Sequence, residues 1–297
     1  MTNIVLDASA LNNLMLCPRL YDFKQNHALV PREGKSNSLQ AGSLVHIIHE
    51  FFNKAIMNGK SRNDSMDIGF IAGREYVRGS YQPNNTYLGI DSEYAIDLPE
   101  ESDKYDIGWK FIFKTMEEYF DYWKNDSATI VGVEEVKKKI IYEDSEMRIL
   151  WKAKLDRIVD MPHGIMSVDV KTMKQRRDTN SNNIQFMGQC IVTESRNMII
   201  DKIGFQTSLK PHEKFERAVM NYTLDRLNEF KDEIVSYYGN MLTAYTESGN
   251  FPPNFTQCQN KYGDCEFYRY DVCNSDRGMR GETLKLYFKE GKKWDPV

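Results

Sequence analysis

Two short stretches in the middle of the chain combine carboxylates with a lysine. Asp156 lies at the end of one strand-like run, and Asp169 and Lys171 follow in Ser-Val-Asp-Val-Lys-Thr at the end of the next. Because Lys171 is two residues after Asp169, both side chains project from the same face of a strand. Carboxylate oxygens bind Mg²⁺ or Mn²⁺, which lower the pKa of bound water, and a neighbouring ammonium can position the attacking hydroxide. This spacing is the geometry that could hold such a metal and activate water toward a phosphate; a surface ion pair on a strand edge is the alternative.

Two further residues could complete this site. His46 lies on a predicted helix over 41–57, on the face opposite its apolar stripe and together with His49, Glu50 and Asn53. An imidazole there could be a metal ligand, with Glu50 as a carboxylate behind it. Gln185, on a predicted helix after the lysine strand, could hold the scissile phosphate or the water. Either residue could instead be an ordinary polar surface group.

The five cysteines divide into four and one. Cys17 lies near the N-terminal end, and three others lie near the other end, at Cys258, Cys265 and Cys273. Four cysteines suffice for a [4Fe–4S] cluster or for a Cys₄ zinc site, although their spacing is looser than the C-x₂-C pairs typical of structural zinc. A link between distant ends closes a long loop and removes much unfolded-chain entropy. Cys190 has no partner in this arrangement and is expected in the core.

Elements that could position these residues follow from the hydrophobic pattern. Residues 160–164 (Asp-Met-Pro-His-Gly) read as the turn of a hairpin that carries Asp156 and Asp169 on its two strands. The order of elements indicates an α/β fold with helical additions at both ends. We predict strands over 129–136, 137–142, 148–159, 165–171 and 198–207, and helices over 41–57, 109–123, 182–193 and 215–246.

Composition excludes several classes of protein. The chain has 297 residues, 41% of them hydrophobic, which is too apolar for a disordered chain. No window approaches the ~18 apolar residues of a membrane helix, and the N-terminus lacks a signal peptide, so a cytoplasmic location is expected. The formal net charge of −4 argues against a broadly basic nucleic-acid coat. No P-loop motif is present, so any helicase would be a separate partner.

The order Gly42-x-x-x-His46, Asp156, Asp169-x-Lys171 and Gln185 resembles the RecB-type branch of the PD-(D/E)XK nuclease superfamily. The resemblance spans nearly the whole chain. It implies a restriction-endonuclease-like fold, with a central mixed sheet flanked by helices, and a metal-dependent DNA nuclease. It also implies that His46, Asp156, Asp169 and the carbonyl of Val170 bind the metal and that Lys171 is catalytic. The family often has Tyr four residues after the glutamine, where this chain has Gln189.

The cysteine pattern carries a second resemblance. A Cys-Pro-Arg near the N-terminus and a C-terminal cysteine triplet are similar to the iron–sulfur clasp of AddB-type and CRISPR-adaptation nucleases and of related phage enzymes. The resemblance implies that Cys17, Cys258, Cys265 and Cys273 hold a structural [4Fe–4S] cluster. Zn²⁺ is the alternative occupant.

Basic residues mark where DNA could bind. Lys174, Arg176 and Arg177 follow the catalytic strand directly, and a second basic run covers residues 277–293. Either could neutralise phosphates, and either could be solvated surface.

These observations combine into one prediction. We expect a single nuclease domain over 1–297, with an N-terminal clasp segment (1–40), a helical region with an insertion (41–125), a catalytic core (126–250) and a cysteine-rich tail (251–297). Its expected activity is that of a Mg²⁺- or Mn²⁺-dependent DNA exonuclease acting on single strands or duplex ends, in phage or bacterial recombination, repair or spacer processing. A separate helicase or recombination protein is the expected partner. The alternatives are a non-catalytic DNA-binding module of the same fold and a zinc-clasped RNA nuclease.

Overall fold

The computed structural model describes residues 2–33, 37–78, 98–102, 107–173, 182–206, 209–260 and 263–291. The chain forms two compact units. Unit 1 contains residues 1–35, 138–152 and 225–297, and unit 2 contains residues 36–137 and 153–224. Strands β3 (Thr129–Glu143) and β4 (Met147–Met161) contribute residues to both units. Within the described ranges, no helix is both long enough and apolar enough to cross a bilayer.

Unit 2 is built on a mixed sheet. The second half of β4 runs antiparallel to β5 (Gly164–Met173), β5 runs parallel to β6 (Asn197–Gly204), and β6 runs antiparallel to β7 (Phe215–Asn221). The β4–β5 connection is the predicted turn, and Gly164 has a φ of +107°, which glycine adopts without a steric penalty. The hairpin therefore places Asp156 and Asp169 on adjacent strands, as the sequence predicts.

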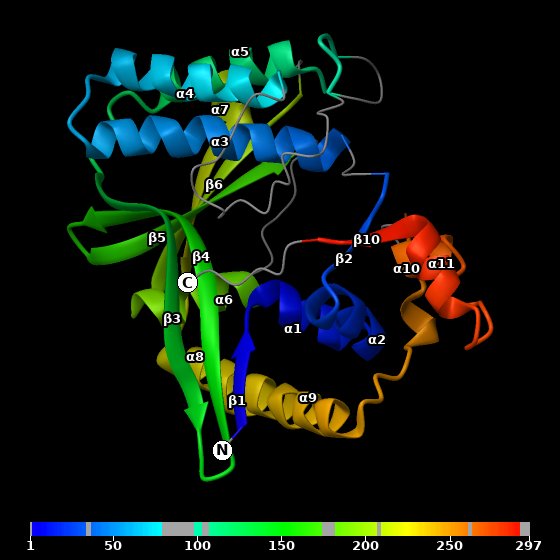
Figure 1. The fold of residues 1–297 in the computed structure, drawn as a ribbon. Helices are drawn as coiled ribbons and strands as arrows, with labels where there is room; N and C mark the ends of the chain where they lie inside the picture. The colour runs from blue at the N-terminus through cyan, green and yellow to red at the C-terminus, as the bar shows by residue number, and fades with distance from the viewer. Residues whose placement is uncertain are drawn as a thin grey trace. The chain divides into compact units, whose positions relative to one another are not determined.

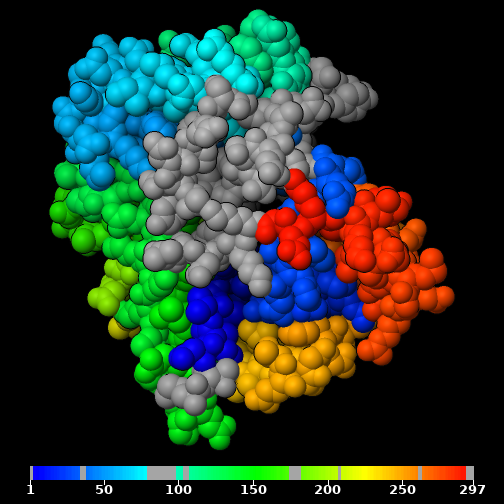
Figure 2. Space-filling view, viewed as in Figure 1, coloured from blue at the N-terminus to red at the C-terminus, as the bar shows by residue number. Residues whose placement is uncertain are grey.

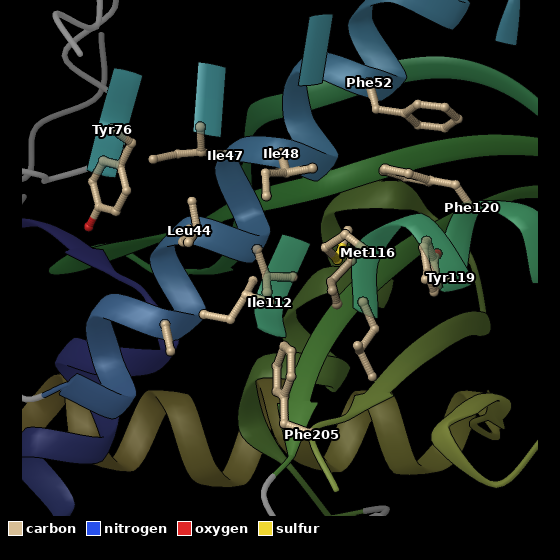
Figure 3. Packing of buried hydrophobic residues seen from close by; sticks show 14 of the residues in the cluster. Leu44, Ile47, Ile48, Phe52, Tyr76, Ile112, Met116, Tyr119, Phe120 and Phe205 are labelled. Carbon is tan, nitrogen blue, oxygen red and sulfur yellow. The ribbon is translucent and has the colours of Figure 1, made fainter. Parts of the chain in front are cut away.

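Helices cover both faces of this sheet. Helices α3 (Asn37–Met57), α4 (Arg62–Val77) and α5 (Trp109–Tyr122) form a layer that is drawn in blue to green in Figure 1. Figure 3 shows their apolar side chains packed together, with the Phe52 and Phe120 rings stacked at 4.0 Å. This core includes Val170 of β5 and Ile203 of β6. Helix α6 (Ile184–Thr193) contacts Asp169, which alternates with Val170, so it lies on the opposite face.

Unit 1 brings together both ends of the chain. Strand β1 (Thr2–Leu6) runs parallel to the first half of β4, and β2 (Leu29–Pro31) pairs with β10 (Phe288–Glu290). In Figure 2 the red and orange C-terminal residues accordingly lie against blue N-terminal residues. The helical elements of this unit are α1 (Ala8–Leu16), α2 (Pro18–Tyr21), η1 (Asp22–Asn26), α8 (Leu224–Glu229), η3 (Phe230–Val235), α9 (Ser236–Ser248), η4 (Phe255–Gln257), α10 (Glu266–Arg269) and α11 (Arg280–Tyr287), and a short hairpin joins β8 (Gln259–Asn260) to β9 (Gly263–Asp264).

One predicted helix and one predicted strand boundary were wrong, and one strand was not predicted. The helix predicted over 215–246 begins only at Leu224, because residues 215–221 form β7 and pair with β6. The predicted strands over 129–136 and 137–142 form one strand, β3, within which Glu134 has a left-handed backbone with a φ of 56°. Strand β1 was not predicted, and it pairs with β4, a strand far along the sequence. The mixed sheet with flanking helices confirms the predicted fold class.

Candidate active site and cysteine pocket

The predicted catalytic residues of β4, β5 and α6 come together in unit 2. Asp169 is 1% exposed, and its Oδ1 accepts hydrogen bonds from Gln185 Nε2 (2.7 Å) and Gln189 Nε2 (2.8 Å). Lys171 Nζ lies 2.8 Å from Asp169 Oδ2 and 3.0 Å from Gln185 Oε1. Asp156 Oδ2 accepts a hydrogen bond from the Val170 backbone N–H at 2.8 Å. The structure thus brings Asp156, Asp169, Lys171 and Gln185 together.

Burial makes Asp169 dependent on cations. Desolvation is the largest influence on this carboxyl and raises its pKa, as does the charge of Asp156, whereas the Lys171 ammonium lowers it. A buried carboxylate is costly unless it is paired with positive charge. Lys171 provides one positive charge beside the two carboxylates of Asp156 and Asp169. A divalent cation would supply the remaining positive charge that these carboxylates need.

A second group of ligands lies beside Asp156. His46 Nδ1 is 3.7 Å from Asp156 Oδ2, and the side chain of His46 is 31% exposed. His46, Glu134 and Asp156 each offer one ligand atom, and these atoms lie within 4.8 Å of one another. An imidazole and two carboxylates suit Mn²⁺ or Mg²⁺.

Glu134 is the site residue that sequence reasoning missed. Burial and the nearby Asp156 charge raise its pKa to about 8, while its ion pair with Lys154 opposes the shift. In the sequence Glu134 is one of three glutamates in a strand, with no motif around it. The direction of the Glu134 side chain depends on the left-handed backbone of this residue, with a φ of 56°. Few non-glycine residues adopt this conformation, and no sequence pattern predicts it.

The polar face of α3 is buried. His49, Glu50 and Asn53 all lie in the interior of unit 2, whereas His46 reaches the ligand group beside Asp156. Glu50 is ion-paired with Lys54 at 2.5 Å, and its charge acts on Glu134. Helix α3 therefore packs its apolar side chains in the core with α4 and α5, while His46 lies beside Asp156 of β4.

The four predicted ligand cysteines line one pocket in unit 1. Cys17, Cys258, Cys265 and Cys273 surround a cavity of about 140 Å³ together with Arg19 and Phe23. Cys17 Sγ accepts a hydrogen bond from the Asn254 backbone N–H at 3.2 Å. Backbone N–H groups of α10 oppose the rise in the pKa of Cys265, and the Arg19 guanidinium opposes the rise in the pKa of Cys273. Donors of this kind stabilise thiolates, the form that binds metal.

The pKa values of the cysteine thiols and the distances between their sulfur atoms bear on which metal group the cysteine pocket could hold. Burial raises the pKa values of Cys258, Cys265 and Cys273, and the other thiols add to the shift. Tetrahedral Zn²⁺ with Zn–S of ~2.3 Å would bring its sulfur ligands to about 3.8 Å from one another. Among the described residues, no three of these sulfur atoms lie within 4.8 Å of one another. A single tetrahedral Zn²⁺ would therefore require these sulfur atoms to move closer together.

The fifth cysteine and the first basic run are the remaining predicted site residues. Cys190 is buried in α6, and desolvation raises its pKa to about 12, as for an unreactive thiol of the core. The basic run of Lys174, Arg176 and Arg177 lies outside the described residues.

Comparison with known proteins places this arrangement in a family. Among solved structures, a candidate exonuclease from Eubacterium rectale is 15% identical, with a TM-score of 0.48 over 90% of this chain and 88% of that one. LHK-Exo, crystallised with dAMP, is 12% identical, with a TM-score of 0.33 over 72% of this chain and 95% of its own. No curated protein matches the sequence. The model of the PD-(D/E)XK nuclease superfamily matches residues 6–268, so the chain belongs to that superfamily.

Proposed function

We propose that this protein is a Mg²⁺- or Mn²⁺-dependent DNA exonuclease of the RecB-type branch of the superfamily. The observation that carries the proposal is the convergence of Asp169, Lys171 and Gln185, with Lys171 Nζ 2.8 Å from the carboxylate and 3.0 Å from the amide. Asp156 reaches the same strand through the Val170 N–H. An ion pair on a strand edge would leave Asp169 exposed, whereas this carboxylate is buried beneath two glutamines.

The donors fit a hard divalent cation. We assign His46, Asp156, Asp169 and the carbonyl of Val170 as its ligands, and we add Glu134 because its carboxylate lies in the group with His46 and Asp156. When bound, the ion supplies Lewis-acid activation of the phosphate and lowers the pKa of a coordinated water. Superfamily membership supports this assignment, since PD-(D/E)XK nucleases use divalent metals.

The remaining chemistry belongs to the side chains. Lys171 directs its ammonium into the site, where it can hold the attacking water and balance the charge of the phosphate. Gln185 accepts from Lys171 and donates to Asp169, so it sets the relative positions of the ammonium and the carboxylate. Gln189 donates a second hydrogen bond to Asp169, so it acts on that carboxylate where related enzymes often have tyrosine.

We propose that the cysteine pocket holds a [4Fe–4S] cluster that stabilises unit 1. The four thiols, their N–H donors and the cavity of about 140 Å³ support this assignment. The cluster would join Cys17 to the C-terminal triplet within unit 1, and we also propose that residues 1–297 form a single nuclease domain. Lys174, Arg176 and Arg177 follow β5 directly in the sequence, and we propose that they bind the DNA backbone.

The substrate assay that tests the proposal compares DNA forms. Purified protein with Mg²⁺ or Mn²⁺ is expected to shorten end-labelled linear DNA progressively and to leave covalently closed circles intact. Comparison of single-stranded with duplex linear DNA then gives the preferred form. Absence of cleavage on every DNA form with both metals would contradict the proposed activity, and cleavage of closed circles as fast as linear DNA would contradict an exonuclease. Matched RNA substrates test the RNA-nuclease alternative.

Replacement of Glu134 with Gln tests the added ligand. The neutral amide keeps the shape of the side chain but binds a divalent cation less well, so the Mn²⁺ concentration for half-maximal cleavage should rise by about 10-fold or more. Glu135→Gln is the matched control, because Glu135 is the next residue in the chain and its carboxylate is not in the ligand group. An equal Mn²⁺ requirement in the Glu134→Gln variant and in the wild type would remove Glu134 from the ligand set.

A further inference from the structure

A buried ionic network lies within unit 2, and it is centred on Asp201 of β6. Asp201 is 0% exposed, and its Oδ2 accepts from the Tyr119 hydroxyl at 2.6 Å, from Arg157 Nη2 at 3.3 Å and from Arg217 Nε at 3.1 Å. Tyr119 belongs to α5, so the network lies on the α5 side of the sheet. Burying a charge is expensive, and removing one partner of a buried ion pair leaves the other uncompensated. The positions of these side chains are therefore tightly coupled.

Arg157 connects this network to the site. It follows Asp156 on β4, so the two side chains point to opposite faces of the sheet. In the sheet register Arg157 is opposite Val168 of β5, and Val170 of β5 is opposite Asp201. The Arg157 guanidinium, which is part of a residue only 5% exposed, thus crosses β5 from β4 to β6. It crosses on the reverse side of the strand that carries Asp169 and Lys171.

The same network reaches the helix that carries His46. His49, three residues further along α3, is buried, and its ring lies 5.9 Å from the Tyr119 ring. Burial first, and then the charges of Arg157, His46 and Arg217, hold the pKa of His49 well below its usual value, so the imidazole is neutral. Asn53 Nδ2 donates to the backbone carbonyl of His49 at 2.6 Å. The same nitrogen lies 2.9 Å from His49 Nδ1. The His49–Tyr119 ring contact joins α3, which carries His46, to α5 and the network, and the Asn53 contacts hold the His49 ring within the helix.

We propose that Arg157 and Asp201 are positioning residues for the metal site. Their ion pair holds β4 and β6 at a set separation on either side of β5, which places the Asp156 carboxylate against the Val170 N–H and beside His46. The inference rests on the metal site proposed above. It assigns to the pair a role in metal affinity in addition to its role in stability.

Arg217 provides a matched control within the network. It binds the same Asp201 oxygen, but from β7, which carries none of the proposed ligands. Its guanidinium also binds Asp126 at 2.7 Å and stacks on Trp123 at 3.9 Å. Removal of Arg217 should therefore cost stability while leaving the β4–β6 connection through Arg157 in place.

The test measures Mn²⁺ binding without turnover. The parent is Lys171→Ala, in which free Mn²⁺ is titrated by electron paramagnetic resonance, and thermal unfolding is followed in parallel. Adding Arg157→Met or Asp201→Asn should weaken Mn²⁺ binding by about 10- to 100-fold, the usual effect of residues that orient metal ligands. Arg157→Lys should restore part of the affinity, because it keeps the charge. Arg217→Met should lower the unfolding temperature and keep the affinity of the parent.

Each outcome decides between the two roles. Parental Mn²⁺ affinity in folded Arg157→Met or Asp201→Asn overturns the inference, and so does an equal loss of affinity in Arg217→Met, which would indicate general loosening of the unit. If Arg157→Met does not fold, Arg157→Lys and Asp201→Asn decide by the same criterion. If the parent itself binds no Mn²⁺, the proposed metal site fails and the inference fails with it, and that result is distinct from a loss confined to the variants.

Discussion

Replacing Lys171 with Ala is expected to reduce DNA cleavage by about 10²- to 10⁴-fold, the usual contribution of a positioned group that takes part in the chemical step. The ammonium lies 2.8 Å from Asp169, and no other lysine of the described residues is ion-paired with that carboxylate. Asp169→Asn should cause a loss of at least the same size, because it removes a proposed metal ligand and leaves Lys171 beside an uncharged amide. Both variants are measured by initial rates on end-labelled DNA at saturating Mn²⁺.

Lys202→Ala is the matched control for this prediction. Lys202 lies opposite Lys171 in the register of β5 and β6, but its ammonium pairs with Glu216 at 3.0 Å. Its removal should leave the cleavage rate close to that of the wild type. Retained cleavage in both Lys171→Ala and Asp169→Asn would contradict the assigned active site, and an equal loss in Lys202→Ala would show that the effect comes from the sheet as a whole.

Replacing Cys265 with Ser is expected to remove most of the visible absorption near ~400 nm from protein purified without oxygen. Cys265 lines the cysteine pocket, so its replacement takes one of the four proposed ligands away. The variant should also lose stability, by about 2–5 kcal/mol if the cluster acts like a native cross-link that closes a long loop. Absorption spectra, iron and zinc content, and denaturant unfolding check these expectations.

Cys190→Ser is the control for the cysteine pocket. It replaces a buried cysteine of α6 that lies outside the pocket, so the spectrum should be unchanged. Wild-type protein that is colourless and holds one zinc ion would contradict the cluster and support the zinc alternative. Full absorption in Cys265→Ser would remove that residue from the ligand set.

Much of the candidate site could be predicted from the spacing of residues that are close together in the sequence. Asp169 and Lys171 share a face because a strand alternates, and the turn over 160–164 brings Asp156 onto the neighbouring strand. These relations depend on residues close together in the chain. The four cysteines could be grouped from sequence because free thiols are few and because a resemblance linked their positions.

Other features depended on contacts between distant segments. The strand over 215–221 was predicted as helix, since its pattern is ambiguous and only pairing with β6 selects the extended form. Glu134 enters the ligand group through an uncommon backbone conformation within β3. The network of Arg157, Asp201 and Tyr119 joins residues from three elements, and in the sequence each looks like an ordinary polar or aromatic side chain.

By itself the sequence determined the α/β class, the hairpin with its carboxylates and lysine, and the superfamily to which these residues point, because each depends on short-range periodicity or spacing. The tertiary structure alone decided that Glu134 lies beside His46 and Asp156, that Gln189 binds Asp169, and that a buried ionic network lies on the opposite face of β5. Those contacts join separate elements, so they depend on the tertiary structure. Burial sets their strength, because a charge in the interior is costly unless an opposite charge or a hydrogen-bond partner lies beside it.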